Sequence, residues 1–172
     1  MTLFPHGRSF RLDFVHAHGP NIFSIQTPQG RFNVLSFTSP ADVVARGIPE
    51  KAIIGTLPSN VVDISQATLK QNASFVLFLH KVIATHGPIA PSLMNEALQI
   101  GRGSLFLIDA RATTPGGQQE SEDVFGMFQV EGGQIVKDSY QPNPDYLLVS
   151  KRGLFVLDTW FHARLLEELA KL

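Results

Sequence analysis

The chain has 172 residues, of which 44% are hydrophobic and 17% are charged, and its formal net charge is −1. This balance is typical of a compact soluble protein. A near-neutral chain without a cluster of Lys and Arg argues against binding to nucleic acid or to an anionic membrane. The absence of cysteine excludes disulfides, thiolate nucleophiles and Cys-based metal sites.

The ends and the apolar runs of the chain bear on its location and its domain organisation. The N-terminus lacks the basic-then-apolar pattern of a signal peptide, and no apolar run approaches the roughly 18 residues of a membrane span. We therefore predict a cytoplasmic protein. We predict a single globular domain over residues 1–172, and the alternative division places a small N-terminal lobe at residues 1–60.

The first third of the chain predicts strands. Residues 10–14 alternate between apolar and polar side chains, and the runs 22–26 and 32–37 flank the segment Pro28-Gln29-Gly30. Proline presets φ and glycine tolerates positive φ, so this segment predicts a hairpin turn between two strands.

A short helix and a connector should follow this hairpin. Ser39 and Pro40 form a helix start, and Gly47 ends the helix. Residues 48–60 contain two prolines, and we predict an irregular connector there.

The middle of the chain predicts one long helix. Ser65 can cap its first turn, and Gly87 with Pro88 predicts a left-handed cap and a stop. Its second half is apolar nearly all the way round, so it needs cover on every side, either from the chain's own sheets or from a second subunit.

A further helix and a strand come next. Pro91 and Ser92 open a helix that Gly101 should end. The continuous apolar run 105–108 predicts a strand buried on both faces.

The last third predicts a polar loop at 112–123, a β-meander and a C-terminal helix. Glu131-Gly132-Gly133 joins the strands of one hairpin, Lys151-Arg152-Gly153 joins those of another, and Pro142-Asn143-Pro144 should be irregular between them. Asp158 caps the final helix. The fold class expected is α+β, with a mainly antiparallel sheet (an N-terminal hairpin region and a C-terminal meander) around the long central helix.

His16 and His18 are the candidate metal ligands. Two histidines two residues apart on a strand project to the same side, which suits two ligands of one ion. A third ligand would have to come from elsewhere, such as His6 or His86. The alternative is a strand end that leaves the core.

His80, Asp109 and Arg111 are the candidate catalytic residues. His80 interrupts an apolar row of the long helix, where a buried neutral imidazole could act as a general base or could simply be a core residue. Asp109 and Arg111 follow the buried strand, at a position where binding sites are common. Glu120, Glu122 and Asp123 could join Asp109 around a cation, or could form a solvated loop beside a structural Asp–Arg pair.

Two hypotheses of function remain open, and the sequence does not decide whether the protein is an enzyme. The first is a non-catalytic domain that acts through protein–protein binding or as a homodimer, through the long helix or a sheet edge. The second is a small-molecule hydrolase with a cleft near Asp109, Arg111 and His80. No motif identifies a cofactor, and no phosphate-binding loop or nucleophile elbow is present.

Overall fold

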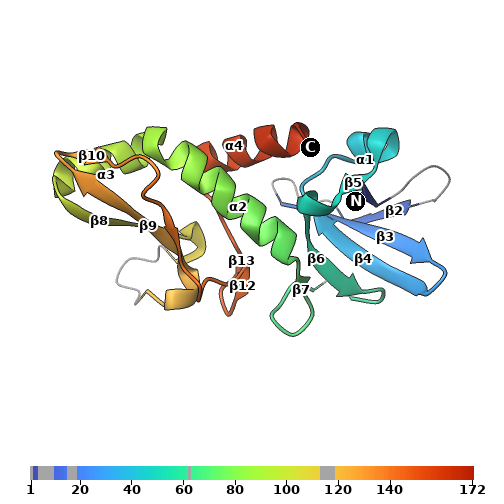
Figure 1. The fold of residues 1–172 in the computed structure, drawn as a ribbon. Helices are drawn as coiled ribbons and strands as arrows, with labels where there is room; N and C mark the ends of the chain where they lie inside the picture. The colour runs from blue at the N-terminus through green and yellow to red at the C-terminus, as the bar shows by residue number, and fades with distance from the viewer. Residues whose placement is uncertain (1, 4–9, 15–18, 62, 113–118) are drawn as a thin grey trace. The chain divides into compact units, whose positions relative to one another are not determined.

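The computed structural model describes residues 2–3, 10–14, 19–61, 63–112 and 119–172 (Figure 1). The chain forms two compact units: unit 1 comprises Met1–Phe78 and Leu166–Leu172, and unit 2 comprises Leu79–Leu165. The predicted α+β class is confirmed, because helices accompany sheets whose strand pairings in the described residues are all antiparallel. The prediction of a single domain stays a prediction.

Unit 1 is built around a five-stranded sheet in the order β2-β3-β4-β6-β7 (Figure 1). A second pair, β1-β5, lies outside this sheet. The helical elements are α1 (Pro40–Arg46) and a short 3-10 turn, η1 (Glu50–Ala52). The strands are β1 (Thr2–Leu3), β2 (Phe10–Phe14), β3 (Asn21–Thr27), β4 (Gly30–Ser36), β5 (Ile48–Pro49), β6 (Ile53–Pro58) and β7 (Lys70–Gln71).

The predicted hairpin and the predicted short helix of unit 1 are confirmed. β3 and β4 pair through to Thr27 and Gly30, and Gly30 has a positive φ of 133°. At α1, the Ser39 hydroxyl accepts the Asp42 N–H at 3.1 Å, and Gly47 closes the helix. The turn and cap signals come from residues that are neighbours in the chain, so they can be predicted from the sequence alone.

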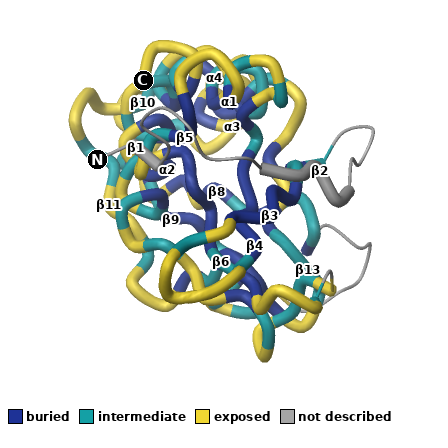
Figure 2. Tube along the Cα trace, turned by 90° about the vertical axis from the view of Figure 1, so that its right-hand side faces the viewer, coloured by how far each residue is buried: buried dark blue, intermediate teal, exposed yellow. Residues whose placement is uncertain are grey.

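The connector predicted at residues 48–60 is wrong, because residues 53–58 form β6, an interior strand of the five-stranded sheet. β6 lies between β4 and β7 and buries Ile54 and Leu57. Glycine at position 55 permits β6 to pair with β7, since a Cβ there would lie 2.6 Å from the Lys70 carbonyl oxygen. Figure 2 shows β3 and β4 as mostly buried beside β6, which marks the core of this unit.

The long helix α2 (Ala73–His86) begins eight residues later than predicted. Asn72 caps it, with its Oδ1 accepting the Ser74 N–H at 3.1 Å. The predicted cap, Ser65, instead lies in a turn with Thr68, and β7 follows before the helix. Leu77 of α2 is 73% exposed, so the apolar surface of this helix is not covered on every side.

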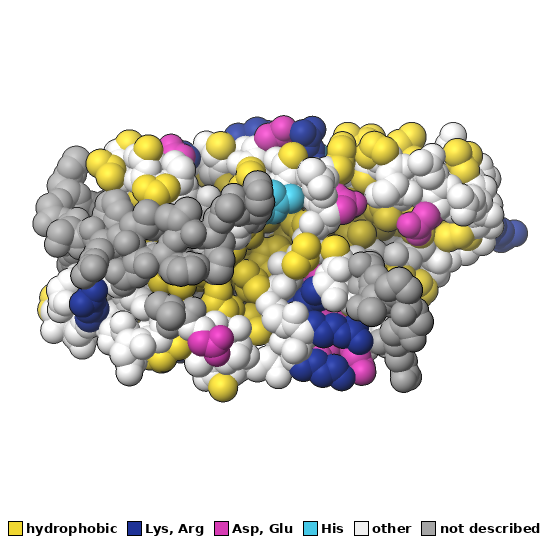
Figure 3. Space-filling view, turned by 180° about the vertical axis from the view of Figure 1, so that it is seen from behind, with side chains coloured by type: hydrophobic (Ala, Val, Ile, Leu, Met, Phe, Trp, Pro, Cys, Tyr) yellow, Lys and Arg dark blue, Asp and Glu magenta, His cyan; other side chains and the backbone are white. Residues whose placement is uncertain are grey.

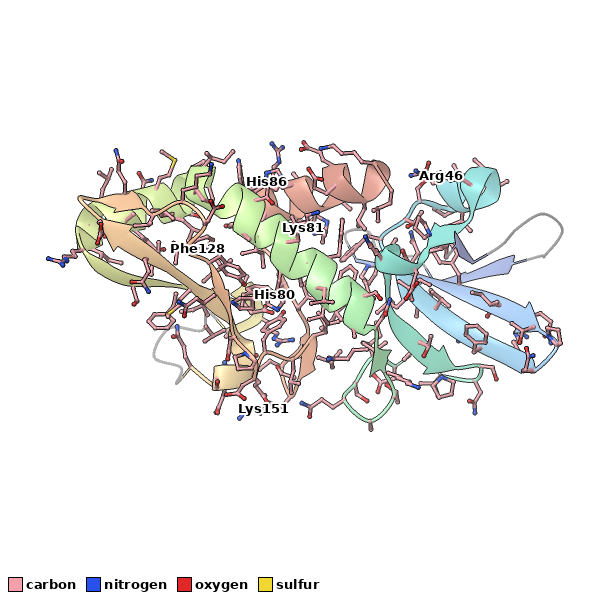
Figure 4. The ribbon with its side chains drawn as sticks, in the orientation of Figure 1. Arg46, His80, Lys81, His86, Phe128 and Lys151 are labelled. Carbon is pink, nitrogen blue, oxygen red and sulfur yellow. The ribbon has the colours of Figure 1, made fainter. Side chains whose placement is uncertain are left out.

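Gly87 is not the left-handed cap that the sequence predicted. It begins a 3-10 turn, η2 (Gly87–Ile89), and its φ lies outside the left-handed region. The glycine is required by packing, because a Cβ at this position would overlap the ring of Phe128. Figure 4 shows Phe128 between β9 and α2.

Unit 2 contains a small sheet in which β9 pairs with β8 on one edge and with β10 and β11 on the other. A two-stranded pair, β12-β13, lies outside it. The remaining helical elements are α3 (Pro91–Ile100), α4 (Thr159–Ala170), η3 (Ala110–Ala112) and η4 (Ser121–Asp123). The strands are β8 (Gly103–Ile108), β9 (Val124–Glu131), β10 (Gln134–Ile135), β11 (Gln141–Pro142), β12 (Val149–Ser150) and β13 (Gly153–Leu154).

Several predicted boundaries of unit 2 are confirmed. Gly101, with a φ of 71°, ends α3, and the Asp158 carboxylate caps α4 by accepting the Phe161 N–H at 2.8 Å. The turn at Gly132 and Gly133 joins β9 to β10.

Two predictions about strands in unit 2 are wrong. β8 is not buried on both faces: Leu105 and Leu107 are buried, whereas Phe106 between them is 53% exposed. Pro142 belongs to a strand, the short β11, where an edge position tolerates a residue without an N–H.

Among the described residues, no single helix has the length and apolar character needed to cross a membrane. A pair of helices bent by 62°, Ala73–Ile89 with Pro91–Ile100, passes this test jointly, on length and composition alone.

Candidate functional site

Arg111 is the centre of a buried polar cluster in unit 2. It follows β8 in the turn η3, and its side chain is 2% exposed. Each of its five N–H groups donates a hydrogen bond. Nε donates to Asp123 Oδ1 at 2.8 Å. The four terminal N–H groups donate to the carbonyl oxygens of Leu148, Gly153, Glu122 and Leu147.

Two buried carboxylates complete this cluster. Asp109 accepts the backbone N–H groups of Arg111 and Val156 at 3.0 and 2.9 Å, and its Oδ2 lies 3.4 Å from Arg111 Nε. The second oxygen of Asp123 accepts from Arg152 Nη1 at 3.1 Å. Two carboxylates therefore face two guanidinium groups, and their charges balance.

Two opposing effects act on the pKa of the Asp109 carboxyl. Burial raises its pKa above the ordinary value, while the hydrogen bonds from Arg111 and Val156 and the Arg111 charge lower it. The Tyr146 hydroxyl adds a further hydrogen bond to Asp109 Oδ2 at 2.9 Å. Such donors stabilise the charged form of a carboxyl and so oppose the effect of burial.

His80 lies beside this cluster, at the buried side of α2 (Figure 4). Its Nδ1 is 2.8 Å from the Tyr140 hydroxyl, which donates to the Phe125 carbonyl oxygen at 3.2 Å. The Tyr146 ring meets the imidazole edge-on, with the centroids 5.9 Å apart. Burial lowers the pKa of His80 and raises the pKa of both tyrosines.

Tyr146 connects two of the predicted site residues, because its ring contacts His80 and its hydroxyl donates a hydrogen bond to Asp109. Tyr146 was not among the site residues predicted from the sequence, and Asp123 was expected either beside a cation with Asp109 or in a solvated loop. Asp123 is fully buried, whereas Glu120 pairs with Lys151 at 3.0 Å. A catalytic role for His80, Asp109 and Arg111 stays a prediction.

The predicted metal ligands lie outside the described residues, since His16 and His18 are not among them. Within the described part of the chain, no group of three or more His, Asp or Glu side chains could hold a metal ion. The largest basic group visible in Figure 3 lies against acidic side chains.

The outer face of the unit 2 sheet is apolar and solvent-exposed. Phe106 of β8 pairs with Met127 of β9, and Ile108 pairs with Val124. An open groove of about 320 Å³ lies over this face, and we call it the outer groove. Its lining consists of Phe106, Ser121, Val124, Gly126, Met127, Gln141, Pro142, Asn143 and Pro144.

None of the described residues that line the outer groove is charged. The Asn143 amide is held within unit 2, because its nitrogen donates to the carbonyl oxygens of Ser121 and Val124 and its oxygen accepts the Asp145 N–H. The groove therefore presents an apolar floor with few polar groups at its margin.

A second apolar hollow of about 260 Å³ lies between α3 and β10. Met94 and Leu98 form its helical wall, and these side chains are 48% and 68% exposed. Unit 2 thus exposes apolar surface at two places, and the described residues that line each of them are uncharged.

Comparison with known protein families, with characterised proteins and with solved structures finds no significant match to this chain.

Proposed function

We propose that this protein is a non-catalytic binding module whose outer groove receives an extended, uncharged apolar segment of a protein partner. The observation that carries this proposal is a row of apolar side chains on one sheet face, the exposed Phe106 with the half-buried Met127 and Val124, over a groove whose described lining residues are all uncharged. Contiguous exposed apolar surface is a recurring mark of binding sites.

The shape of the outer groove favours a peptide segment over an enclosed small molecule. Its volume lies at the lower end of the ~300–1,000 Å³ range of small-molecule pockets, and it is only partly enclosed. Pro142 and Pro144 stiffen one wall, which lowers the entropy lost when a ligand orders that wall.

The state of Arg111 also supports a non-catalytic function. All five of its N–H donors are used by acceptors within unit 2, so none is left for an anionic substrate. The cluster of Asp109, Arg111 and Asp123 accordingly serves to hold together the segments that carry the outer groove.

A peptide selection tests this function. A random peptide library is selected against the intact protein, and the affinities of the selected peptides are measured with the wild type, Met127→Lys and Val156→Lys. Val156 is 47% exposed and does not line the groove, so it is the matched control.

We expect apolar peptides whose affinity falls at least tenfold with Met127→Lys, because a charge would be desolvated in the groove, and less than twofold with Val156→Lys. Peptides that bind both variants as tightly as the wild type would contradict the proposal.

A further inference from the structure

β8 has one edge that no described strand pairs with. β9 covers its other edge over the whole length of Gly103–Ile108. Figure 1 shows β8 at the margin of the small sheet. Its sequence, Gly-Ser-Leu-Phe-Leu-Ile, contains no charged residue and no proline. Proteins usually protect edge strands with such residues, because an unprotected edge is a template for another strand.

The hydrogen bonds of β9 fix which backbone groups of β8 point toward the free edge. Gln129 of β9 accepts from Val136 N–H and donates to Ser139 Oγ, so its backbone groups point away from β8. Directions alternate along a strand, and the neighbouring residue Phe128 therefore faces β8, where it pairs with Leu105.

By the same alternation, the N–H and C=O groups of Leu105 and Leu107 point to β9. Those of Ser104 and Phe106 point to the free edge. The register with β9 shifts between Leu107 and Ile108, but Asp109 N–H donates to the Asp123 carbonyl oxygen on the β9 side, so Ile108 between them also points to the free edge. The free stretch ends there, because Ala110 N–H donates to the Val156 carbonyl oxygen. The edge thus offers backbone donors and acceptors at every second residue, spaced as an antiparallel partner strand requires.

We propose that a second copy of this chain pairs with β8 along this edge, antiparallel, about a two-fold axis at Phe106. In this register Phe106 lies opposite Phe106 of the partner subunit, and Ser104 lies opposite the partner's Ile108. All three edge-facing residues then form hydrogen-bonded pairs, each exchanging two N–H···O=C bonds. Any shift of register would pair fewer of them.

Side-chain orientation agrees with this register. The buried residues Leu105 and Leu107 lie opposite each other across the axis, the exposed Phe106 lies opposite its own copy, and the exposed Ser104 lies opposite the half-buried Ile108 on the same face. No like charges meet, because β8 carries none. A two-fold interface uses the same patch on both copies, which this strand satisfies.

This inference goes beyond the proposed function, since it concerns the β8 edge and not the groove floor. Pairing would place the two outer grooves on one continuous face, with the two Phe106 side chains between them. The pairing area of one short strand is small, so we expect a reversible dimer.

Proline at an edge-facing position tests the pairing directly. Ser104→Pro removes an N–H that points away from β9 and blocks a partner strand, while it leaves the bonds between β8 and β9 intact. Ser104→Ala is the matched control. Sedimentation equilibrium should give a wild-type monomer–dimer equilibrium whose association constant falls at least tenfold with Ser104→Pro and less than twofold with Ser104→Ala.

Cross-linking provides a second measurement that does not depend on the proline variant folding. The chain has no cysteine, so Phe106→Cys introduces a unique thiol. The roughly 5.5 Å Cα separation of a hydrogen-bonded pair lies within the range of a disulfide. Mild oxidation should cross-link Phe106→Cys at least tenfold faster than the exposed control Val156→Cys.

The outcomes separate this inference from the proposed function. A wild type that stays monomeric throughout, or equal cross-linking of both cysteine variants, would overturn the dimer and leave the groove proposal intact. Self-association that Met127→Lys abolishes and Ser104→Pro does not would overturn edge pairing and place the contact in the groove.

Discussion

The interior and the outer face of unit 2 reverse the usual distribution of polar and apolar groups. Asp109 and Asp123 are fully buried, whereas Phe106 and Leu98 are more than half exposed. Every buried charge of this cluster forms an ion pair within unit 2, so the cluster stabilises the folded unit. The exposed apolar side chains Phe106 and Leu98 each line a groove, so they are available to bind another molecule.

This comparison predicts that the interior cluster determines stability and that the outer face determines binding. Substitutions in the two regions should therefore separate these two properties.

Arg111→Met should have the largest effect on folding. It leaves Asp109 and Asp123 without their shared cation and removes one donor from each of four carbonyl oxygens. Breaking a buried ion pair from one side costs about 3–5 kcal/mol in the free energy of unfolding. Urea denaturation measures this loss. The control Lys151→Met removes an exposed pair with Glu120 and should change stability by less than ~1 kcal/mol.

Tyr146→Phe should have an intermediate effect. The variant keeps the ring that contacts Phe125 and His80 but removes the hydroxyl that donates to Asp109. A hydrogen bond to a charged acceptor contributes about 1.5–3 kcal/mol, and urea denaturation should show a loss in that range. A loss near zero would mean that Asp109 is satisfied by its other donors alone.

His80 should make stability fall in acid. Burial lowers its pKa in the folded protein, so the unfolded chain binds a proton first as the pH drops below about 6.5. The free energy of unfolding of the wild type should therefore decrease from pH 7.5 to pH 5.0 by more than that of His80→Gln. Chemical denaturation at the two pH values measures the difference. Equal decreases would show that His80 does not contribute.

Phe106→Ser should have the smallest effect on stability. The side chain is 53% exposed and pairs with Met127 on the outer face, so we expect a change of about 0.5 kcal/mol. Its neighbour Leu105 is buried, and Leu105→Ala should cost about 2–4 kcal/mol. A large loss with Phe106→Ser would mean that the outer face belongs to the core.

The parts of the fold that the sequence predicted well depend on local signals. Ser39, Gly47, Gly101 and Asp158 mark helix ends through their own backbone and side-chain chemistry, and all four do so in the structure. The start of α2 was misplaced because two caps compete. Asn72 caps the helix, and the residues from Ser65 form a turn before β7.

The site was only partly predictable, for a physical reason. The pair of Asp109 and Arg111 is close in sequence and was recognised as a structural alternative. The other acceptors of Arg111 come from segments 11 to 42 residues away, which meet only when the fold closes. The exposure of Phe106 was missed because a continuous apolar run does not reveal that only one face of its sheet is covered.

The methionine methyl groups offer the most direct test of the central claim, which is that the outer groove binds an apolar protein segment. The chain has three methionines: Met127 lines the outer groove, Met94 lines the second hollow, and the third is Met1. In spectra of protein labelled at the methionine methyls, a selected apolar peptide should shift the Met127 signal and leave the Met94 signal in place. A peptide that shifts Met94 alone, or that binds without shifting Met127, would contradict the account.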